Sequence, residues 1–126
     1  MHEVDMTKCL LLSLRQWREQ QEPSDQPPRV RVVHLQVGAF TCVEPEALRF
    51  TYAAAVQNSW LEGSELRIEN IPLLARCLAC SNPYSPDPES AYRSPCCDHP
   101  MEEILQGREL RIRSIEFDHP SVPALA

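Results

Sequence analysis

The sequence predicts an α+β fold with two helices on one face of a three-stranded sheet, and a small module inserted before the last strand. Helical and strand-like hydrophobic patterns alternate as far as residue 69, and a further strand pattern follows residue 107. Between them, Cys77-Leu78-Ala79-Cys80 is followed by Cys96-Cys97-Asp98-His99. Two such clusters are typical of a structural zinc site, so the inserted module is predicted to be zinc-ribbon-like.

Length and composition indicate one ordinary domain with a modest core, or a small domain plus a metal-stapled module. The chain has 126 residues, of which 43% are hydrophobic and 24% charged, which is a globular composition. Its formal net charge of −6 argues against a nucleic-acid partner, because an acidic surface repels phosphate.

The first residues are acidic where a signal peptide is basic, and the run Leu10-Leu11-Leu12 is too short for a membrane span. We therefore expect a cytoplasmic protein without a membrane partner. Six cysteines in that reducing compartment favour metal or thiol chemistry over disulfides. Cys9 and Cys42 lie outside the two clusters and are expected to be small buried hydrophobic residues.

The first predicted helix comprises residues 3–21. Apolar side chains recur at helical spacing along it: Met6, Leu10, Leu14 and Trp17. The second comprises residues 45–61, where Pro45 and Glu46 suit a first turn and Gly63 follows the end. Apolar residues occur nearly all round this second segment, so we expect it to be well buried.

Three strands are predicted from alternating apolar and polar residues. They comprise residues 30–37, residues 65–69 and residues 110–117. In the last strand the apolar phase slips between Ile112 and Ile115, which predicts a β-bulge.

These elements predict how the chain divides. An α/β domain is expected to comprise residues 1–73 and 108–118, and a zinc-binding domain residues 74–107. Within the latter, residues 81–95 are rich in proline and serine and are expected to form an irregular arm. Residues 119–126 are expected to be a frayed tail.

The fourth ligand of the predicted zinc site is ambiguous. Three thiols fall in a regular C-x-x-C register: Cys77, Cys80 and Cys97. The second C-x-x-C would begin at position 94, where the sequence has Ser94. Cys96 must supply the fourth ligand, or His99 must. A Cys96-x-x-His99 pair with Cys97 spare is a competing set, and the sequence leaves these alternatives open.

A structural role fits this module better than a redox role. A closed zinc site can supply on the order of 10–16 kcal/mol of folding free energy, which a segment with almost no core needs. A thioredoxin-like motif would follow a strand and open a helix. Cys77 and Cys80 instead lie between a strand and a proline-rich segment.

His2 lies beside the α-amine of Met1. The amine, the ionised backbone amide of His2 and its imidazole can form a planar nitrogen chelate, which suits Ni(II) or Cu(II). On the residues alone, a histidine at position two is more often a solvated terminal residue. His34 lies on a predicted strand and is expected to be a surface or partly hydrogen-bonded residue rather than a ligand.

Taken in order, three stretches resemble the HypA/HybF family of nickel-insertion accessory proteins, which act in [NiFe]-hydrogenase maturation. They are Met1-His2-Glu3; Val33-x-Leu35-x-Val37-Gly38 with Val43-Glu44-Pro45-Glu46-x-Leu48-x-Phe50; and Gly107-Arg108-Glu109-Leu110-x-Ile112-x-Ser114-Ile115-Glu116. The resemblance spans residues 1 to about 117, around a cysteine module in the expected place. The departure from the family pattern is Ser94, where a cysteine is expected.

The resemblance implies a nickel metallochaperone and not an enzyme. It implies that Ni(II) is a transient cargo held by His2, with support from the Met1 amine and Glu3, so that the α/β domain is the nickel-binding one. Glu44 occupies an acidic position that contributes in some members. Zinc is implied to be structural.

The implied partners are a HypB-type nickel GTPase and the large hydrogenase subunit, and in some members urease and its accessory proteins. The sequence leaves open whether the protein is a monomer or a homodimer.

Two other interpretations compete with this one. A zinc-ribbon adaptor that carries no nickel should present a basic face on the module, but the acidic residues there outnumber the basic ones. An enzyme with a cysteine or histidine nucleophile would need a third, orienting group, which the linear spacing does not reveal.

Overall fold

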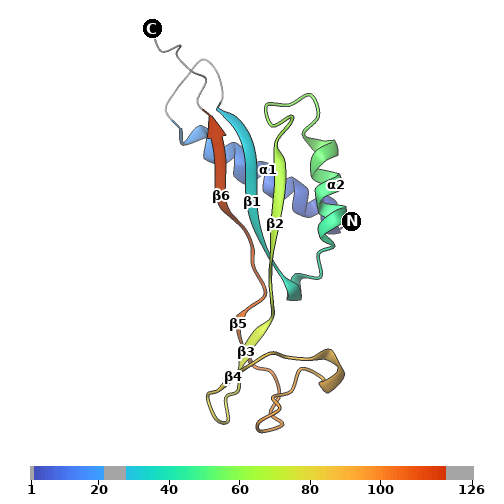
Figure 1. Cartoon of the computed structure of the whole chain (residues 1–126), viewed down its shortest axis with the longest axis vertical. Coiled ribbons are helices and arrows are strands. Elements are labelled where there is room, and N and C mark those ends of the chain that lie inside the picture. Colours follow the sequence, from blue (N-terminus) through green and yellow to red (C-terminus); the bar gives the residue numbers. More distant parts are fainter. Residues whose placement is uncertain (1, 22–27, 119–126) are drawn as a thin grey trace. The chain divides into compact units, whose positions relative to one another are not determined.

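The computed structural model describes residues 2–21 and 28–118 (Figure 1). The chain folds into two compact units. The first, here called the body, contains the described residues up to Leu35, Val43–Ile68 and those from Ile112 onward. The second, here called the module, contains Gln36–Cys42 and Glu69–Arg111. The expected tail at 119–126 lies outside the described residues.

Two helices were predicted and two are present in the body. Helix α1 is His2–Glu19, and α2 is Pro45–Ala55. Helix α2 ends at Ala55 and not at residue 61, because the chain turns there and Asn58 has a left-handed φ of 60°. A residue in that conformation cannot continue a right-handed helix.

The expectation that the second helix is well buried was wrong. Within α2, only Leu48 and Tyr52 are buried, and the Phe50 side chain is 74% exposed. Val56 and Leu61, which fall within the predicted helix at residues 45–61, are buried but reach the core from the turns after α2.

The sheet of three long strands has the order β2-β1-β6. Strand β1 is Arg29–Gly38, β2 is Glu65–Ile71 and β6 is Leu110–Asp118. In the body, α1 crosses this sheet and α2 packs beside it, as Figure 1 shows. Strand β1 is central in this sheet, and its buried residues include Val32 and Val33, which lie on opposite faces. The α+β class and the two-helix, three-stranded arrangement are confirmed.

Side-chain contacts join the helices to each other and to the sheet. The Trp17 and Phe117 rings meet edge to face with centroids 4.8 Å apart. The hydroxyls of Thr7 and Thr51 are 2.7 Å apart and link α1 to α2. The core of the body comes from both helices, the turns after α2 and the sheet: Leu10, Leu14, Val30, Val32, Val33, Leu35, Leu48, Tyr52, Val56, Leu61 and Leu66.

The module has a small antiparallel sheet that the sequence did not predict. Its order is β4-β3-β5, formed by β3 (Leu74–Arg76), β4 (Pro83–Tyr84) and β5 (Glu103–Gln106). These strands are too short for a two-residue alternation to be recognised. Their core is small: Ala75, Cys77 and Tyr84, with Met101 packed against it.

Within the module, two chain segments cross in very close contact. Gly38 N–H donates to the Glu109 carbonyl, and Phe40 N–H donates to the Gly107 carbonyl, each at 2.7 Å. A Cβ at Gly38 would lie 2.1 Å from the Gly107 carbonyl. Only a residue without a side chain fits between these backbones.

None of the described helices is long and apolar enough to cross a membrane. Cys9 and Cys42 are exposed, which corrects the expectation that they are buried. His34 is hydrogen-bonded to Glu116 on the neighbouring strand and is partly buried, as its strand position predicted.

Candidate metal centre

Two turns of the module present the cysteines, and their backbone hydrogen bonds match each other residue for residue. In the first turn, Ser81 N–H donates to the Cys77 carbonyl and Cys77 N–H to the Asn82 carbonyl. In the second, Asp98 N–H donates to the Ser94 carbonyl and Ser94 N–H to the His99 carbonyl. The residues after the two turns, Ser81 and Asp98, both have left-handed backbones, with φ of 67° and 48°.

This correspondence makes Ser94 the counterpart of Cys77, and Cys97 the counterpart of Cys80. The two turns therefore have the same C-x-x-C spacing, at positions 77 and 80 and at positions 94 and 97. In the second turn, a serine occupies the position of the first cysteine. Cys96 comes from inside the second turn, at the place that Ala79 occupies in the first.

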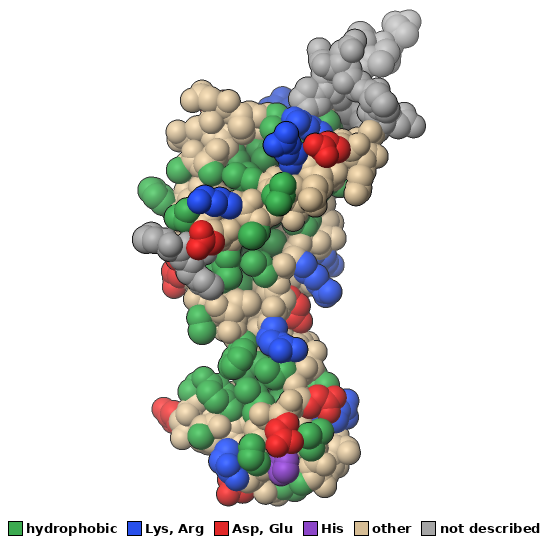
Figure 2. All heavy atoms as spheres, turned by 180° about the vertical axis from the view of Figure 1, so that it is seen from behind, with side chains coloured by type: hydrophobic (Ala, Val, Ile, Leu, Met, Phe, Trp, Pro, Cys, Tyr) green, Lys and Arg blue, Asp and Glu red, His purple; other side chains and the backbone are tan. Residues whose placement is uncertain are grey.

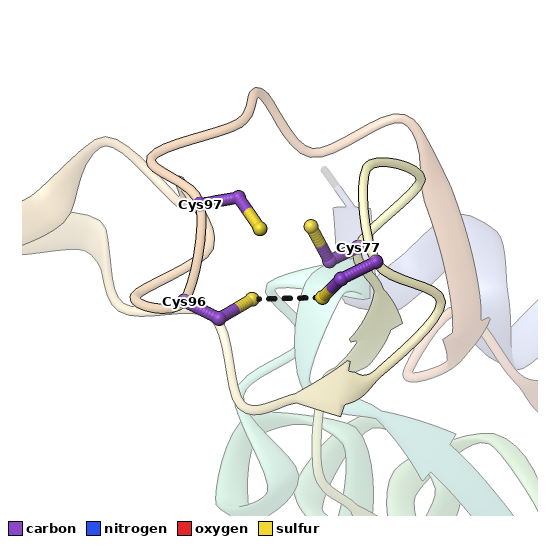
Figure 3. Close-up of side chains that lie close together, drawn as sticks. Cys77, Cys96 and Cys97 are labelled. Carbon is purple, nitrogen blue, oxygen red and sulfur yellow. Dashed lines mark hydrogen bonds between the residues drawn. The ribbon is translucent and has the colours of Figure 1, made fainter.

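The structure brings four sulfur atoms together. The Sγ atoms of Cys77, Cys80, Cys96 and Cys97 all lie within 4.8 Å of one another. Those of Cys80 and Cys96 are 3.3 Å apart. Figure 3 shows the labelled side chains of Cys77, Cys96 and Cys97 pointing toward one another. Four thiolates bound to zinc at about 2.3 Å would lie roughly 3.8 Å apart, so the cluster fits a four-coordinate ion with small side-chain adjustments.

The four thiols differ in exposure. Cys77 is 1% exposed and belongs to the small core of the module. Cys80, Cys96 and Cys97 are exposed. The Cys77 sulfur also lies 3.3 Å from the Ser94 hydroxyl oxygen, and the Ser94 side chain is itself buried.

In the absence of a metal ion, the interactions within the cluster favour ionisation of one thiol and oppose ionisation of its neighbours. The hydrogen bond with Ser94 lowers the pKa of Cys77 to about 6, because it stabilises the thiolate. Hydrogen bonds with Cys80 and then Cys96 raise the pKa of Cys97 to about 12. The pKa of Cys96 is also raised, chiefly by its hydrogen bond with Cys80. Four adjacent thiolates need a cation between them, and soft sulfur ligands suit zinc.

The structure does not bring His99 into the group of sulfur ligands found in the described part of the chain. Its Nε2 atom is buried without a hydrogen-bond partner and lies 3.6 Å from a carboxylate oxygen of Glu102. The backbone N–H of His99 instead donates to the Ser94 hydroxyl at 3.0 Å. In this geometry Cys96, and not His99, stands next to the other three thiols.

The second predicted metal site lies at the start of α1. Met1 and the side chain of His2 lie outside the described residues. The Glu3 carboxylate accepts a hydrogen bond from the backbone N–H of Glu44, at 3.3 Å, and Glu44 is the residue that precedes α2. Two predicted ligand residues, 41 positions apart, therefore meet where both helices begin.

Sequence reasoning missed the contact that Ser94 makes with Cys77. The available signal was the serine itself, at a position where the C-x-x-C register expects a ligand. A small hydroxyl residue there can still reach a sulfur atom.

Comparison with known proteins decides the family. The family model described as "Hydrogenase/urease nickel incorporation, metallochaperone, hypA" matches residues 1–117. The chain belongs to the HypA family. Members are nickel metallochaperones, so the protein is a nickel metallochaperone of hydrogenase maturation, as the resemblance implied.

Two relatives are aligned with nearly the whole chain. The "Hydrogenase maturation factor HypA" of Synechococcus sp. (strain JA-2-3B'a(2-13)) is 48% identical over 94% of this chain and 88% of its own length. The "Guanidine hydrolase-activating protein A" of Synechocystis sp. (strain ATCC 27184 / PCC 6803 / Kazusa) is 43% identical over 98% of this chain and 100% of its own length.

A solved HypA structure supports the fold. The solution structure of the Ni metallochaperone HypA from Helicobacter pylori has a TM-score of 0.67 to this chain, at 18% sequence identity. The match covers 94% of this chain and 99% of that one. At this identity the likeness concerns the fold alone.

Proposed function

We propose that this member of the HypA family holds Ni(II) at its amino terminus through His2 and the Met1 amine, with support from Glu3 and Glu44. The observation that carries the proposal is the family match, which begins at residue 1 and so includes the Met1-His2-Glu3 stretch. The Glu3–Glu44 contact supports it, because it brings the Glu3 carboxylate to the backbone of Glu44, where both helices begin.

The helical position of His2 also favours a chelate. The first backbone N–H groups of a helix have no partner within the helix. His2 is the first residue of α1, so its amide can lose a proton and bind a metal without breaking a helical hydrogen bond. Amine, amide and imidazole nitrogens then match the square-planar preference of Ni(II).

Nickel binding of this kind depends on pH. The α-amine has a reference pKa of about 8, and both the amine and the amide must lose protons to bind the metal. Nickel affinity should therefore rise with pH. A reversible site of this type suits a carrier that must release its cargo.

We further propose that the four cysteines hold a structural zinc ion. Among the described residues, the buried hydrophobic cluster at the cysteine site has three members, Ala75, Cys77 and Tyr84, so a bound zinc ion would add stability that these few contacts do not supply. We propose that the chain has two functional domains. The zinc-binding domain comprises residues 74–107, and the nickel-binding domain comprises residues 1–73 and 108–118. The cluster must stay reduced to bind metal, which favours a cytoplasmic location.

The test is metal analysis of untagged protein after addition of nickel. We expect one zinc and one nickel per chain, with only the nickel lost in His2→Ala. Adding two residues before Met1 should also abolish nickel binding and leave zinc unchanged. His34→Ala is the matched control, because that histidine lies on β1 and pairs with Glu116. Unchanged nickel affinity in the extended protein would rule out the amino-terminal chelate.

A zinc-ribbon adaptor without nickel is the alternative that this experiment separates, since it predicts zinc alone. The face of the module seen in Figure 2 has acidic and basic side chains interspersed. That distribution gives little support to an adaptor that binds an acidic partner. We assign the protein no catalytic step.

The specific partner proteins, and any client besides a hydrogenase, are the remaining question. We propose that the protein delivers nickel to the large subunit of a hydrogenase, together with a HypB-type GTPase. The relative named as a guanidine hydrolase-activating protein is aligned over its whole length, which favours a guanidine hydrolase as a second candidate. Nickel-loaded protein should be mixed separately with each nickel-free enzyme and with a urease apoenzyme. The client is the enzyme that gains nickel and activity, and His2→Ala should abolish that gain.

A further inference from the structure

The Ser94 side chain is buried beside the cysteine cluster. It is 2% exposed, its hydroxyl oxygen lies 3.3 Å from the Cys77 sulfur, and the same oxygen accepts the His99 N–H at 3.0 Å. Ser94 also has the backbone position that matches Cys77 in the other turn. The serine thus replaces a thiol in sequence but remains in contact with the site.

The hydrogen-bonding capacity of a hydroxyl decides what Ser94 does there. A hydroxyl has one donor and two acceptor lone pairs. The His99 N–H occupies an acceptor position, and a protonated Cys77 can donate to the other. Once Cys77 is a thiolate, its sulfur can only accept. The buried Ser94 O–H can then donate to that sulfur, 3.3 Å from the hydroxyl oxygen. Ser94 also interacts with the Cys96 side chain, but Cys77 is the buried thiol that shares its surroundings.

We propose that Ser94 is a positioning residue for the metal centre: its hydroxyl donates a hydrogen bond to the Cys77 thiolate and makes Cys77 the anchoring sulfur of the site. The inference rests on the proposed zinc site. It adds a role for a residue that is not itself a ligand.

The proposed bond has a chemical consequence. A hydrogen bond to a metal-bound thiolate withdraws electron density from the sulfur and makes it a weaker nucleophile. Cys77 is also buried, whereas Cys80, Cys96 and Cys97 are exposed. The four ligands are therefore unequal, and reagents that attack sulfur should reach the three exposed ones first.

Cobalt(II) in place of zinc reports on this bond directly, because its sulfur-to-metal charge-transfer bands depend on the electron density of the thiolates. We expect these bands to shift to longer wavelength in Ser94→Ala, since an unbonded thiolate gives up its electron more easily. Ser94→Thr retains the hydroxyl and should restore the wild-type position. The ligand-field bands, which report four-coordinate geometry, should stay unchanged.

Ser85→Ala is the matched control. Ser85 is an exposed serine of the same module, and among the described residues it makes no hydrogen bond to the four sulfur atoms, so its loss removes a hydroxyl without removing a contact of the cluster. It should leave every band in place. Charge-transfer bands at the wild-type position in a cobalt-loaded Ser94→Ala protein would overturn the proposal.

A second measurement needs no variant. The zinc-loaded wild-type protein is treated with iodoacetamide for increasing times, and each cysteine is followed by mass spectrometry. Cys77 should be alkylated last, and its modification as early as that of the exposed thiols would also overturn the proposal. If the wild-type protein bound neither zinc nor cobalt, the zinc site itself would fail, which is a different result from an unshifted spectrum.

Discussion

Replacing Gly38 by alanine should be one of the most destabilising single changes in this chain. Gly38 has a φ of −77°, which any residue adopts, so alanine adds no backbone strain. The added Cβ would lie 2.1 Å from the carbonyl carbon and oxygen of Gly107, whereas ordinary contact begins at 3.4 Å. The two backbones must separate by about 1.3 Å, which stretches both 2.7 Å hydrogen bonds of this crossing to roughly 4 Å.

The magnitude follows from those two bonds. A buried backbone group left unpaired costs about 1–3 kcal/mol, so two lost bonds cost roughly 2–6 kcal/mol. Total stabilities of single domains are about 5–15 kcal/mol. Gly38→Ala should therefore remove a large share of the stability of the module.

Two other glycines separate the causes. Gly63 has a φ of +87° with nothing within 4 Å of an added Cβ, so Gly63→Ala should cost only the left-handed strain of about 1–2 kcal/mol. Gly107 has a φ of +116°, and its Cβ would lie 2.8 Å from the Leu73 Cα, so Gly107→Ala combines strain with a clash.

Urea unfolding of the zinc-loaded proteins, followed by far-ultraviolet circular dichroism, gives the ranking. We expect the unfolding midpoint to fall least in Gly63→Ala and much further in Gly38→Ala and Gly107→Ala, with an unchanged slope. If Gly38→Ala were no less stable than Gly63→Ala, the steric argument would be refuted.

Three further predictions concern the metal site and the sheet. Cys96→Ser should lose zinc in a metal titration, whereas His99→Ala should retain it, because only the Cys96 sulfur lies among the other thiols. In the Cys96→Ser protein, Ser94→Cys should recover zinc binding, since the residue at position 94 already reaches a sulfur atom. The hydrogen bond and charge of His34 hold the pKa of Glu116 below its ordinary value, so His34→Ala should raise that pKa in a carboxyl NMR titration. A carboxyl group whose pKa is lower in the folded state stabilises the fold at pH values above its unfolded-state pKa. The stability difference between wild type and His34→Ala should therefore shrink as the pH falls through the folded-state pKa of Glu116. A difference that stays constant with pH would contradict this.

The sequence predicted those parts of the fold that depend on long periodic patterns. Both helices and all three long strands of the first sheet were found, because their hydrophobic spacing extends over several turns or alternations. The strands of the module are too short for such a pattern, so the second sheet was missed. The early end of α2 was missed because it depends on one left-handed residue, Asn58, whose conformation is set by its tertiary surroundings.

The same limit applies to the metal centre. Spacing identified three thiols and the gap at Ser94, because C-x-x-C is a local motif. The preference for Cys96 over His99 depends on how the second turn folds, which brings one side chain to the sulfur atoms and leaves the other outside that group. The contact between Glu3 and Glu44 likewise depends on how the two helices pack, so it could not be predicted from their spacing in the sequence.

The four boundaries between body and module along the chain have a practical consequence for anyone who wishes to study the zinc centre by itself. A fragment cut at the obvious ends, such as 69–111, would lack residues 36–42. Those residues donate two backbone hydrogen bonds to the crossing and bring the Phe40 ring to 6.0 Å from that of Tyr92, between centroids. A fragment that folds like the module must therefore include residues 36–42 as well. A circularly permuted gene could join them to residues 69–111 through a short linker.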